Sequence, residues 1–439
     1  MMTRKRSLAL AALTFAAATV PILAASESES FVALFNGRDL AGWVNVNCAP
    51  ETWTVRDGMI VCTGIPTGVL RTKRQYENCI LELDWRHMVK GGNAGLFVHS
   101  DPLPAVGQPF TRSIEVQIMD GNAGDIFAIH GATMTPDKPH PRGWTRSLPS
   151  EDRMNPPGQW NHYRVECRDG RVSLAVNGEV VTRACHVNPR KGYICLESEG
   201  SEVHFRNIRI CELPGTNPPA EVVAREEDPG FRLLYNGLDL RGWRNASGSE
   251  GHWQAKNWIL SYDGKSEASG EGKHLWTEEE FGDFSLIVDW RLTSKTKIDF
   301  VPVILPDGSQ ALDSEGKPMA AAIMDAGDSG LYIRGQSKCQ INIWSWPVGS
   351  GEIWGYRTDI TMPPEVRRAA TPILNADNPP GRWNRFEVTA RGERVTVKLN
   401  GRTVIDEAHL PGMPAKGRIA LQHHGDPVQF ANIFIKEFK

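Results

Sequence analysis

Hydrophobic and polar residues alternate with a period of two along most of this chain. Within residues 79–86 the residues Cys, Leu, Leu and Trp alternate with Ile, Glu, Asp and Arg, which gives a strand with one apolar and one largely polar face. Asn177-Gly178 is typical of a tight hairpin turn. Helix is limited to a turn or two, near residues 278–281 or 364–368. The pattern predicts an all-β fold, a β-sandwich or jelly roll. The other predicted strands, separated by Gly- and Pro-rich turns, lie at residues 95–99, 114–119, 162–167, 172–176, 193–197 and 203–210.

The two halves of the chain repeat the same motifs in the same order. We therefore predict two tandem domains of one kind, at residues 31–213 and 231–439, joined by a linker at 214–230 that is rich in Pro, Gly and charge. The matched motifs are LFNGRDLAGW (34–43) with LYNGLDLRGW (234–243), DWR (84–86) with DWR (289–291), PPGQWN (156–161) with PPGRWN (379–384), and FRNI (205–208) with FANI (430–433).

The spacing between matched motifs differs between the copies, which indicates insertions. The larger insertion, of roughly thirty residues, falls around Lys295–Gly327 in the second copy, and a shorter one falls around Ser100–Arg112 in the first. We expect both to be surface loops, because loops tolerate changes of length that a sheet cannot.

The first 25 residues differ from the rest of the chain. A basic start at Arg4, Lys5 and Arg6 precedes an apolar run that ends in small residues, a pattern that predicts a cleavable signal peptide at 1–25. The mature protein is then periplasmic or secreted, with an uncleaved anchor as the alternative. No later segment is apolar enough to span a membrane.

Composition excludes some classes of partner. The 49 basic and 52 acidic residues nearly cancel, to a net charge of -3, so nothing indicates binding to nucleic acid or to an anionic membrane. A neutral polar substrate fits better. Seven of the eight cysteines lie in the first copy, which leaves disulfide pairing open, and no Cys/His spacing typical of zinc occurs.

The repeated motifs together resemble the 3-keto-disaccharide hydrolase domain family, over residues 31–212 and 231–439. The resemblance implies a concanavalin A-like jelly roll with a sugar site on a concave sheet face. It also implies cleavage of a glycosidic bond in a sugar already oxidised to a ketone at C3. A separate oxidoreductase is expected to make that ketone, because this chain has no dinucleotide-binding fingerprint.

A C3 ketone acidifies the proton on C2, so a base can remove it and the C1 substituent can leave by elimination. Such a site needs a base, an acid, and an Arg or a divalent metal ion to hold the enolate. Glu115 and Gln117 alternate with Val116 and Ile118 and so share one sheet face. Glu115 is the first candidate for the base or a metal ligand, against the alternative of a solvated outer-face pair.

Two further candidates for catalysis are His99 and Glu199. His99 ends a predicted strand and could donate to a sugar or bind a metal with Glu115, although it could equally be a polar edge residue. Its counterpart in the second copy is Arg334. Glu199 lies at a polar strand end, where the second copy has His424.

The remaining candidates would contact the substrate. Asp84 and Arg86 share a face, and an ion pair that keeps the register is the simpler explanation. Asp125, His130 and Trp144 lie on or beside a long loop, where Trp144 could stack on a sugar ring or cover the core.

In the second copy Gln340 and Asn342 replace Glu115 and Gln117, and amides cannot act as bases. We expect the first copy to carry the chemistry and the second to bind sugar or to differ in specificity. A lectin-like binding protein is the alternative, since sugar-binding sandwiches need no base. A mere scaffold would leave Glu115, His99 and Glu199 scattered.

Overall fold

The computed structural model describes residues 29–225, 230–244 and 248–439. The predicted signal peptide at residues 1–25 lies outside these ranges. No helix in the described part of the chain is long and apolar enough to cross a membrane.

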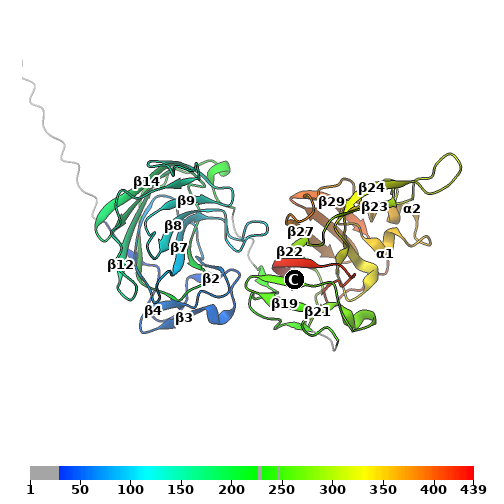
Figure 1. The fold of residues 1–439 in the computed structure, drawn as a ribbon, viewed down its shortest axis with the longest axis horizontal. Helices are drawn as coiled ribbons and strands as arrows, with labels where there is room; N and C mark the ends of the chain where they lie inside the picture. Colours follow the sequence, from blue (N-terminus) through cyan, green and yellow to red (C-terminus); the bar gives the residue numbers. More distant parts are fainter. Residues whose placement is uncertain (1–28, 226–229, 245–247) are drawn as a thin grey trace, which may run out of the picture. The chain divides into compact units, whose positions relative to one another are not determined.

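The first copy folds into a β-sandwich of two antiparallel sheets (Figure 1). The nine-stranded sheet, here called the back sheet, has the order β10 (Thr133–Pro136), β14 (Glu179–Asn188), β13 (Arg171–Val176), β12 (Asn161–Arg168), β6 (Cys79–His87), β16 (Val203–Glu212), β4 (Met59–Cys62) and β3 (Trp53–Arg56), with β1 (Val32–Ala33) beside β16. The seven-stranded sheet, here called the front sheet, has the order β11 (Arg146–Ser147), β9 (Ile126–Ile129), β8 (Ser113–Met119), β7 (Asn93–Ser100), β15 (Tyr193–Ser198), β5 (Gly68–Thr72) and β2 (Trp43–Asn45).

The alternating pattern decides which side chains form the core of this sandwich. Leu81, Leu83 and Trp85 of β6 are buried against Leu96 of β7 and Val116 of β8, which belong to the opposite sheet. Burial of each such side chain contributes about 1.5–3 kcal/mol. The Asn177-Gly178 turn joins β13 to β14, and both residues have positive φ, at 49° and 98°, as a two-residue hairpin of this type requires.

The second copy repeats the arrangement with its own back and front sheets. Its back sheet has the order β19 (Trp253–Lys256), β20 (Ile259–Tyr262), β31 (Val428–Glu437), β22 (Phe284–Leu292), β27 (Asn384–Arg391), β28 (Arg394–Leu399) and β29 (Arg402–His409), with β17 (Arg232–Leu233) beside β31. Its front sheet has the order β18 (Trp243–Arg244), β21 (Leu275–Thr277), β30 (Ala420–Leu421), β25 (Ser329–Tyr332) and β26 (Gln340–Ile343). The predicted all-β class, two jelly-roll sandwiches, is confirmed.

Helix is confined to short segments in the described chain. The prediction at 364–368 is confirmed by α2 (Pro364–Ala369), which follows α1 (Trp354–Arg357). The prediction at 278–281 is wrong, because Phe281 is fully buried and bridges to Gly417 as an extended residue. Single 3-10 turns lie at Pro50–Thr52, Ala220–Val222, Gly270–Lys273 and Ser337–Cys339.

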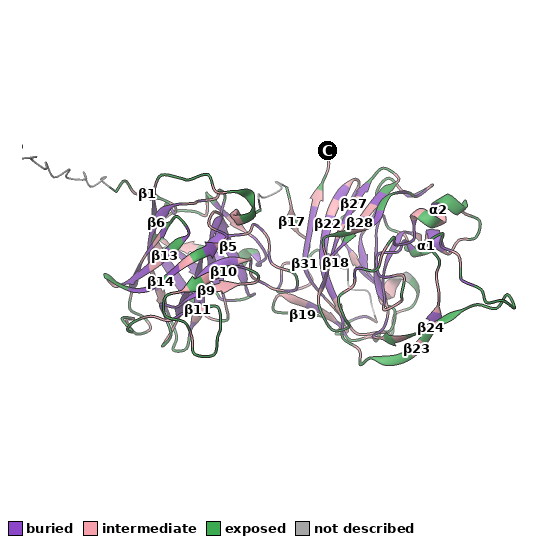
Figure 2. Ribbon diagram, turned by 90° about the horizontal axis from the view of Figure 1, so that it is seen from above, coloured by how far each residue is buried: buried purple, intermediate pink, exposed green. Residues whose placement is uncertain are grey.

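The two insertions differ from each other. Residues 100–112 contain a loop, as predicted, with one isolated bridge between Pro104 and Thr111. The insertion in the second copy is not a plain loop, since β23 (Lys297–Pro302) and β24 (Ala320–Asp325) pair as a hairpin. Residues 297–300 alternate between polar and apolar side chains, a strand pattern that was missed because the segment was judged only by its length. Figure 2 shows that this hairpin is largely exposed, unlike the strands of the sandwiches.

Candidate functional site

Two glutamates meet on the outward face of the first front sheet, away from the core. Glu115 on β8 and Glu197 on β15 flank Gly95 on β7, the strand between them. A Cβ added to Gly95 would lie 2.6 Å from Glu197 Oε2 and 3.2 Å from Glu115 Oε1. Glycine therefore leaves the space in which both carboxyl groups sit. Gln117 projects from the same face of β8, and its side-chain carbonyl accepts the Ile118 N–H at 2.9 Å.

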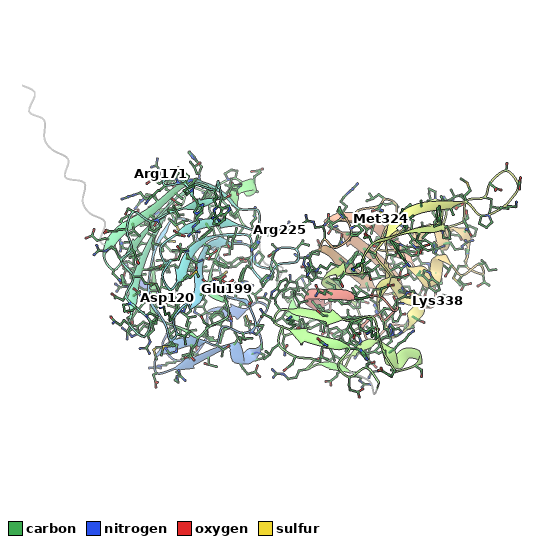
Figure 3. All side chains as sticks on the ribbon, in the orientation of Figure 1. Asp120, Arg171, Glu199, Arg225, Met324 and Lys338 are labelled. Carbon is green, nitrogen blue, oxygen red and sulfur yellow. The ribbon has the colours of Figure 1, made fainter. Side chains whose placement is uncertain are left out.

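A third carboxyl group lies at the rim of this pair. Glu199, which is labelled in Figure 3, follows β15 directly. It accepts a hydrogen bond from the Asn93 side-chain amide at the start of β7. Glu199 is half-buried, whereas Glu115 and Glu197 are buried. We call Glu115, Glu197 and Glu199 the carboxyl cluster. It combines two enclosed acids with one that a leaving group could reach.

Burial dominates the electrostatics of the carboxyl cluster. It raises the pKa of Glu115 to about 8, with further contributions from the charges of Glu199 and Asp125. Burial and the charges of Glu115 and Glu199 raise the pKa of Glu197 well above its ordinary range. Burial also raises the pKa of Glu199. Since two adjacent buried carboxyls resist double ionisation, at least one of Glu115 and Glu197 keeps its proton at neutral pH, and Glu115 ionises as the pH approaches 8.

A buried ion pair lies at the edge of the carboxyl cluster. Asp125 is fully buried and pairs with Arg146 of β11, whose guanidinium also donates to Asn122 Oδ1 at 3.0 Å. The Asp125 carbonyl accepts the Gln117 N–H at 2.9 Å, so the pair is fixed to the strand that carries Glu115. Arg146 is the cation that opposes the rise in the pKa of Glu115. The positive group of the site therefore comes from β11, the strand that pairs with β9.

The loop before β11 carries the aromatic candidate. Trp144 is 48% exposed, and its ring stacks on His140 at 4.3 Å between centroids and an interplanar angle of 10°. A ring this exposed does not cover the core. The Trp144 ring is therefore available as an apolar surface close to Arg146, since the Arg146 guanidinium lies 6.0 Å from the centroid of the Trp144 ring.

His99 does not join the carboxyl cluster. A positive φ of 57° turns the residue at the end of β7, and its ring Nε2 bonds to the Glu77 carbonyl at 3.1 Å. Burial lowers its pKa to about 4, so the ring is neutral at pH 7. His99 and Glu115 therefore have different neighbours. Across the described residues, no group of three or more His, Cys, Asp or Glu side chains is arranged to hold a metal ion.

Asp84 and Arg86 lie in the back sheet, on its outer face. Asp84 contacts His162 Nδ1 at 2.9 Å and Asn207 Nδ2 at 2.7 Å, while Arg86 stacks on Trp160 at 4.5 Å. The expected ion pair between Asp84 and Arg86 is replaced by these cross-strand contacts. The two residues alternate with Leu83 and Trp85, which point into the core, so they face away from the carboxyl cluster.

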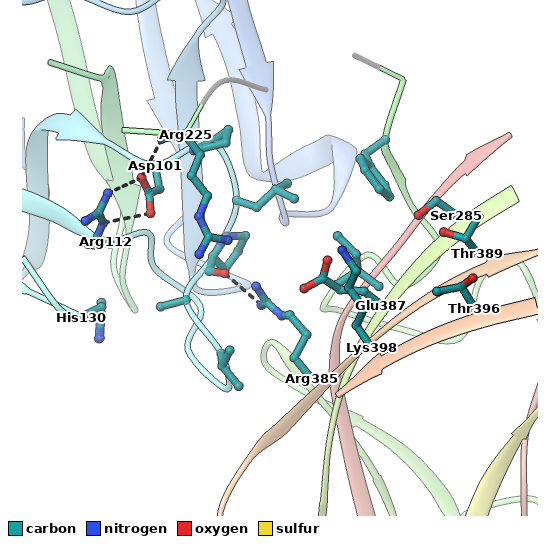
Figure 4. A pocket seen from close by; sticks show the side chains of 17 residues that line it. Asp101, Arg112, His130, Arg225, Ser285, Arg385, Glu387, Thr389, Thr396 and Lys398 are labelled. Atoms are coloured by element: carbon teal, nitrogen blue, oxygen red, sulfur yellow. Dashed lines mark hydrogen bonds and ion pairs between the residues drawn. The ribbon is translucent and has the colours of Figure 1, made fainter. Parts of the chain in front are cut away.

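His130 also lies elsewhere. It has a positive φ of 52° and faces Phe110 at 6.1 Å between ring centroids. Figure 4 shows His130 as one of the residues that line a pocket, near the ion pair of Asp101 and Arg112, whose shortest N–O distance is 3.0 Å. None of the three residues of the carboxyl cluster lines this pocket.

Sequence reasoning missed Glu197 and Asn93 as members of the site. Both follow from alternation: Asn93 is two residues before Gly95, and Glu197 is two residues after Cys195, so each shares the face of its strand with the site. What the sequence did not show is that β7, β8 and β15 are adjacent.

The second front sheet carries the matching positions. Gln340 and Asn342 of β26 lie beside Gln422 around Gly330 of β25, and Gln340 Nε2 donates to Asn342 Oδ1 at 2.7 Å and to Gln422 Oε1 at 2.9 Å. His424 follows two residues later. Arg334 is buried and donates to the Pro414 carbonyl at 2.7 Å and to Asp283 at 3.0 Å, a structural role outside this amide face.

The chain should lose stability as the pH rises from about 5 to 8, because Glu115 has an ordinary pKa of 4.5 and a folded pKa of about 8. Between these values the folded protein holds a proton that the unfolded chain has released. The resulting stabilisation is fully present below 4.5 and is lost as the pH rises through 8. Glu115→Gln should reduce this loss by roughly 2–4 kcal/mol, at about 1.4 kcal/mol per pH unit. Urea unfolding at pH 5 and pH 8 measures it, and identical losses in both proteins would contradict the assignment.

Comparisons with known proteins found matches to parts of this chain. The model of the 3-keto-alpha-glucoside-1,2-lyase-like domain matches residues 30–211 and again residues 230–436. A 3-keto-disaccharide hydrolase of Bacteroides thetaiotaomicron is 22% identical over 232 residues, which are 42% of this chain and 79% of that protein. A crystal structure of a protein assigned as a glycosyl hydrolase from Parabacteroides distasonis is 25% identical, with 42% of this chain and 95% of that chain covered and a TM-score of 0.34. A carbohydrate-binding module from Bacillus subtilis is 14% identical, with 39% and 96% covered and a TM-score of 0.29. Because the family model covers both sandwiches, the chain belongs to the 3-keto-alpha-glucoside-1,2-lyase-like domain family and contains two such domains in tandem.

Proposed function

We propose that the first sandwich cleaves the glycosidic bond of 3-keto-glycosides, by removing the C2 proton and expelling the C1 substituent. The observation that carries this proposal is the buried pair of carboxyl groups, Glu115 and Glu197, which lie together over Gly95 on the outward face of the front sheet, with the pKa of each raised by burial. The name of the Bacteroides relative, a 3-keto-disaccharide hydrolase, supports the substrate class.

The raised pKa of Glu115 suits the removal of a weakly acidic C–H proton. A base works best when its pKa lies near the working pH, because it is then both available and strong. Ionised Glu115 takes the C2 proton, and the electron pair of the C–H bond moves into the ketone as an enolate. Glu197, which keeps its proton, donates a hydrogen bond that stabilises the developing charge.

The enolate then expels the substituent at C1. Its electron pair returns to form the C1–C2 double bond, the C1–O bond breaks, and Glu199 at the rim gives a proton to the departing oxygen. Water next adds to C1 while a proton returns to C2, so the net change is hydrolysis. Asp125 and Arg146 hold β8 in place through the bond from the Gln117 N–H to the Asp125 carbonyl, and Trp144 offers an apolar surface to a sugar ring.

The test is an assay of the full chain with a 3-keto-glucoside that carries a chromogenic aglycone, beside the unoxidised glucoside, with and without chelator. Release from the keto form alone supports the proposal. Release from both substrates would indicate direct hydrolysis by paired carboxylates. Binding without release would identify a lectin-like protein, and loss of release in chelator would add a metal ion to the site.

Two further parts of the proposal concern the setting of the reaction. A separate oxidoreductase must supply the C3 ketone, because the elimination itself consumes no oxidant. We also propose that the chain is exported and that residues 1–25 are removed, which N-terminal sequencing of the protein recovered from an expression host would test.

A further inference from the structure

The second front sheet has three amides where the first has the carboxyls Glu115 and Glu197 and the amide Gln117. Gln340, Gln422 and Asn342 form one hydrogen-bonded group, here called the amide trio, above Gly330. A Cβ on Gly330 would lie 2.9 Å from both Gln340 Nε2 and Gln422 Oε1, so glycine again leaves the space for two long side chains. The two sandwiches thus keep the geometry of the site but differ in its charge.

The amide trio has an unused donor. Asn342 is 1% exposed, and its Oδ1 accepts from Gln340 on this face, while its Nδ2 has no hydrogen-bond partner among the described residues. A buried amide N–H without a partner costs about 1–3 kcal/mol. Such a group is retained where a ligand oxygen satisfies it, and a sugar hydroxyl is a suitable acceptor.

At the rim of the second site, both residues differ from those of the first. Asp328 occupies the position of Asn93, because the Asp328 N–H donates to Asp426 at 3.0 Å as the Asn93 N–H donates to Ser201 at 3.0 Å. His424 occupies the position of Glu199. Burial, with the charges of Asp426 and Asp325, raises the pKa of Asp328 to about 8, and burial lowers the pKa of His424. Both groups are therefore largely uncharged at pH 7.

We propose that the second sandwich contains a separate site that binds a neutral pyranoside without cleaving it, through the amide trio, Asp328 and His424. Amides both donate and accept, as sugar hydroxyls do, and Asp325 and Asp426 at the rim disfavour a sugar that carries a carboxylate. The amide trio offers no base in the place of Glu115. This inference rests on the proposed function only in taking the ligand to be a carbohydrate.

The experiment uses the full chain with Glu115→Gln, so that binding is measured in a protein without the proposed base, and measures the binding of methyl α-D-glucopyranoside by calorimetry. We expect binding to weaken about tenfold when Asn342→Ala is added. The matched control is Gln254→Ala, an exposed amide of the same sandwich that donates to the Gly251 carbonyl, which should leave the affinity unchanged. D-glucuronate should bind more weakly than the glucoside.

Asn342→Asp, which keeps the shape and adds a charge, should weaken binding as Asn342→Ala does and guards against a loss that is due to misfolding. Unfolding midpoints of both variants confirm that they are folded. Equal affinity in the Asn342 variants and in the Gln254→Ala control would overturn the inference, as would no measurable binding in any of them. Release of the aglycone is measured separately, in the chain with an intact Glu115, and should be unchanged by Gln254→Ala. The two proposals can therefore fail separately.

Discussion

Replacing Glu115 by Gln is expected to lower kcat for aglycone release from a 3-keto-glucoside by about 10³-fold, within the 10²–10⁴-fold range of general base catalysis. Gln keeps the size of the side chain and its place beside Gly95, but it cannot accept the C2 proton. KM should change only a few-fold, because the substitution removes a step of the reaction and not a large contact. Initial rates across substrate concentrations measure both quantities.

The matched control is Glu166→Gln, the same substitution on an exposed position of the back sheet, where Glu166 pairs with Arg168 at 2.8 Å. It should leave kcat within about a factor of two, because Glu166 lies on β12 of the back sheet and outside the carboxyl cluster. If Glu115→Gln were as active as this control, the base would have to be another residue. The rate of the wild-type chain should also rise with pH towards 8, as Glu115 loses its proton.

Replacing Arg146 by Met is expected to destabilise the chain by about 3–5 kcal/mol, because Asp125 is left buried without its cation. The cost should shrink as the pH falls, since Asp125 can then take up a proton. Burial already raises its pKa, and removal of Arg146 raises it further. Urea unfolding at pH 8 and pH 5 measures the difference.

Arg168→Met is the comparison for this effect, since it breaks an exposed pair with Glu166 and should cost less than about 1 kcal/mol. An equally small cost for Arg146→Met would mean that water reaches Asp125 in the native state. Arg146→Lys should recover part of the stability, because a cation remains but the bond to Asn122 at 3.0 Å is lost with the guanidinium.

The strands and the repeat could be predicted because alternation and motif order are local properties of the sequence. The segment predicted at 79–86 is β6 (Cys79–His87), and that at 114–119 is β8 (Ser113–Met119). The hairpin within residues 295–327 escaped prediction because its length suggested a loop, although Lys297, Ile298 and Asp299 already alternate.

The site was only partly predictable, because alternation gives the two faces of a strand but not the neighbours of that strand. Glu115 and Glu199 come together since β15 and β8 both pair with β7. Asp84 has the same kind of pattern but lies on a back-sheet strand, so it faces the other way. His99 lies near the end of β7, where its positive φ breaks the alternation and directs its ring to the Glu77 carbonyl.

The central claim, removal of the C2 proton by the first sandwich, is tested most directly by running the cleavage in D₂O and examining the released keto sugar by NMR. The C4 proton, which also flanks the ketone, is the internal control for exchange in solution. Elimination followed by addition of water predicts deuterium at C2 well in excess of that at C4, with product and label both formed about 10³-fold more slowly by Glu115→Gln. Cleavage that leaves the C2 proton in place would contradict the account, because the C1 substituent would then have left by direct displacement.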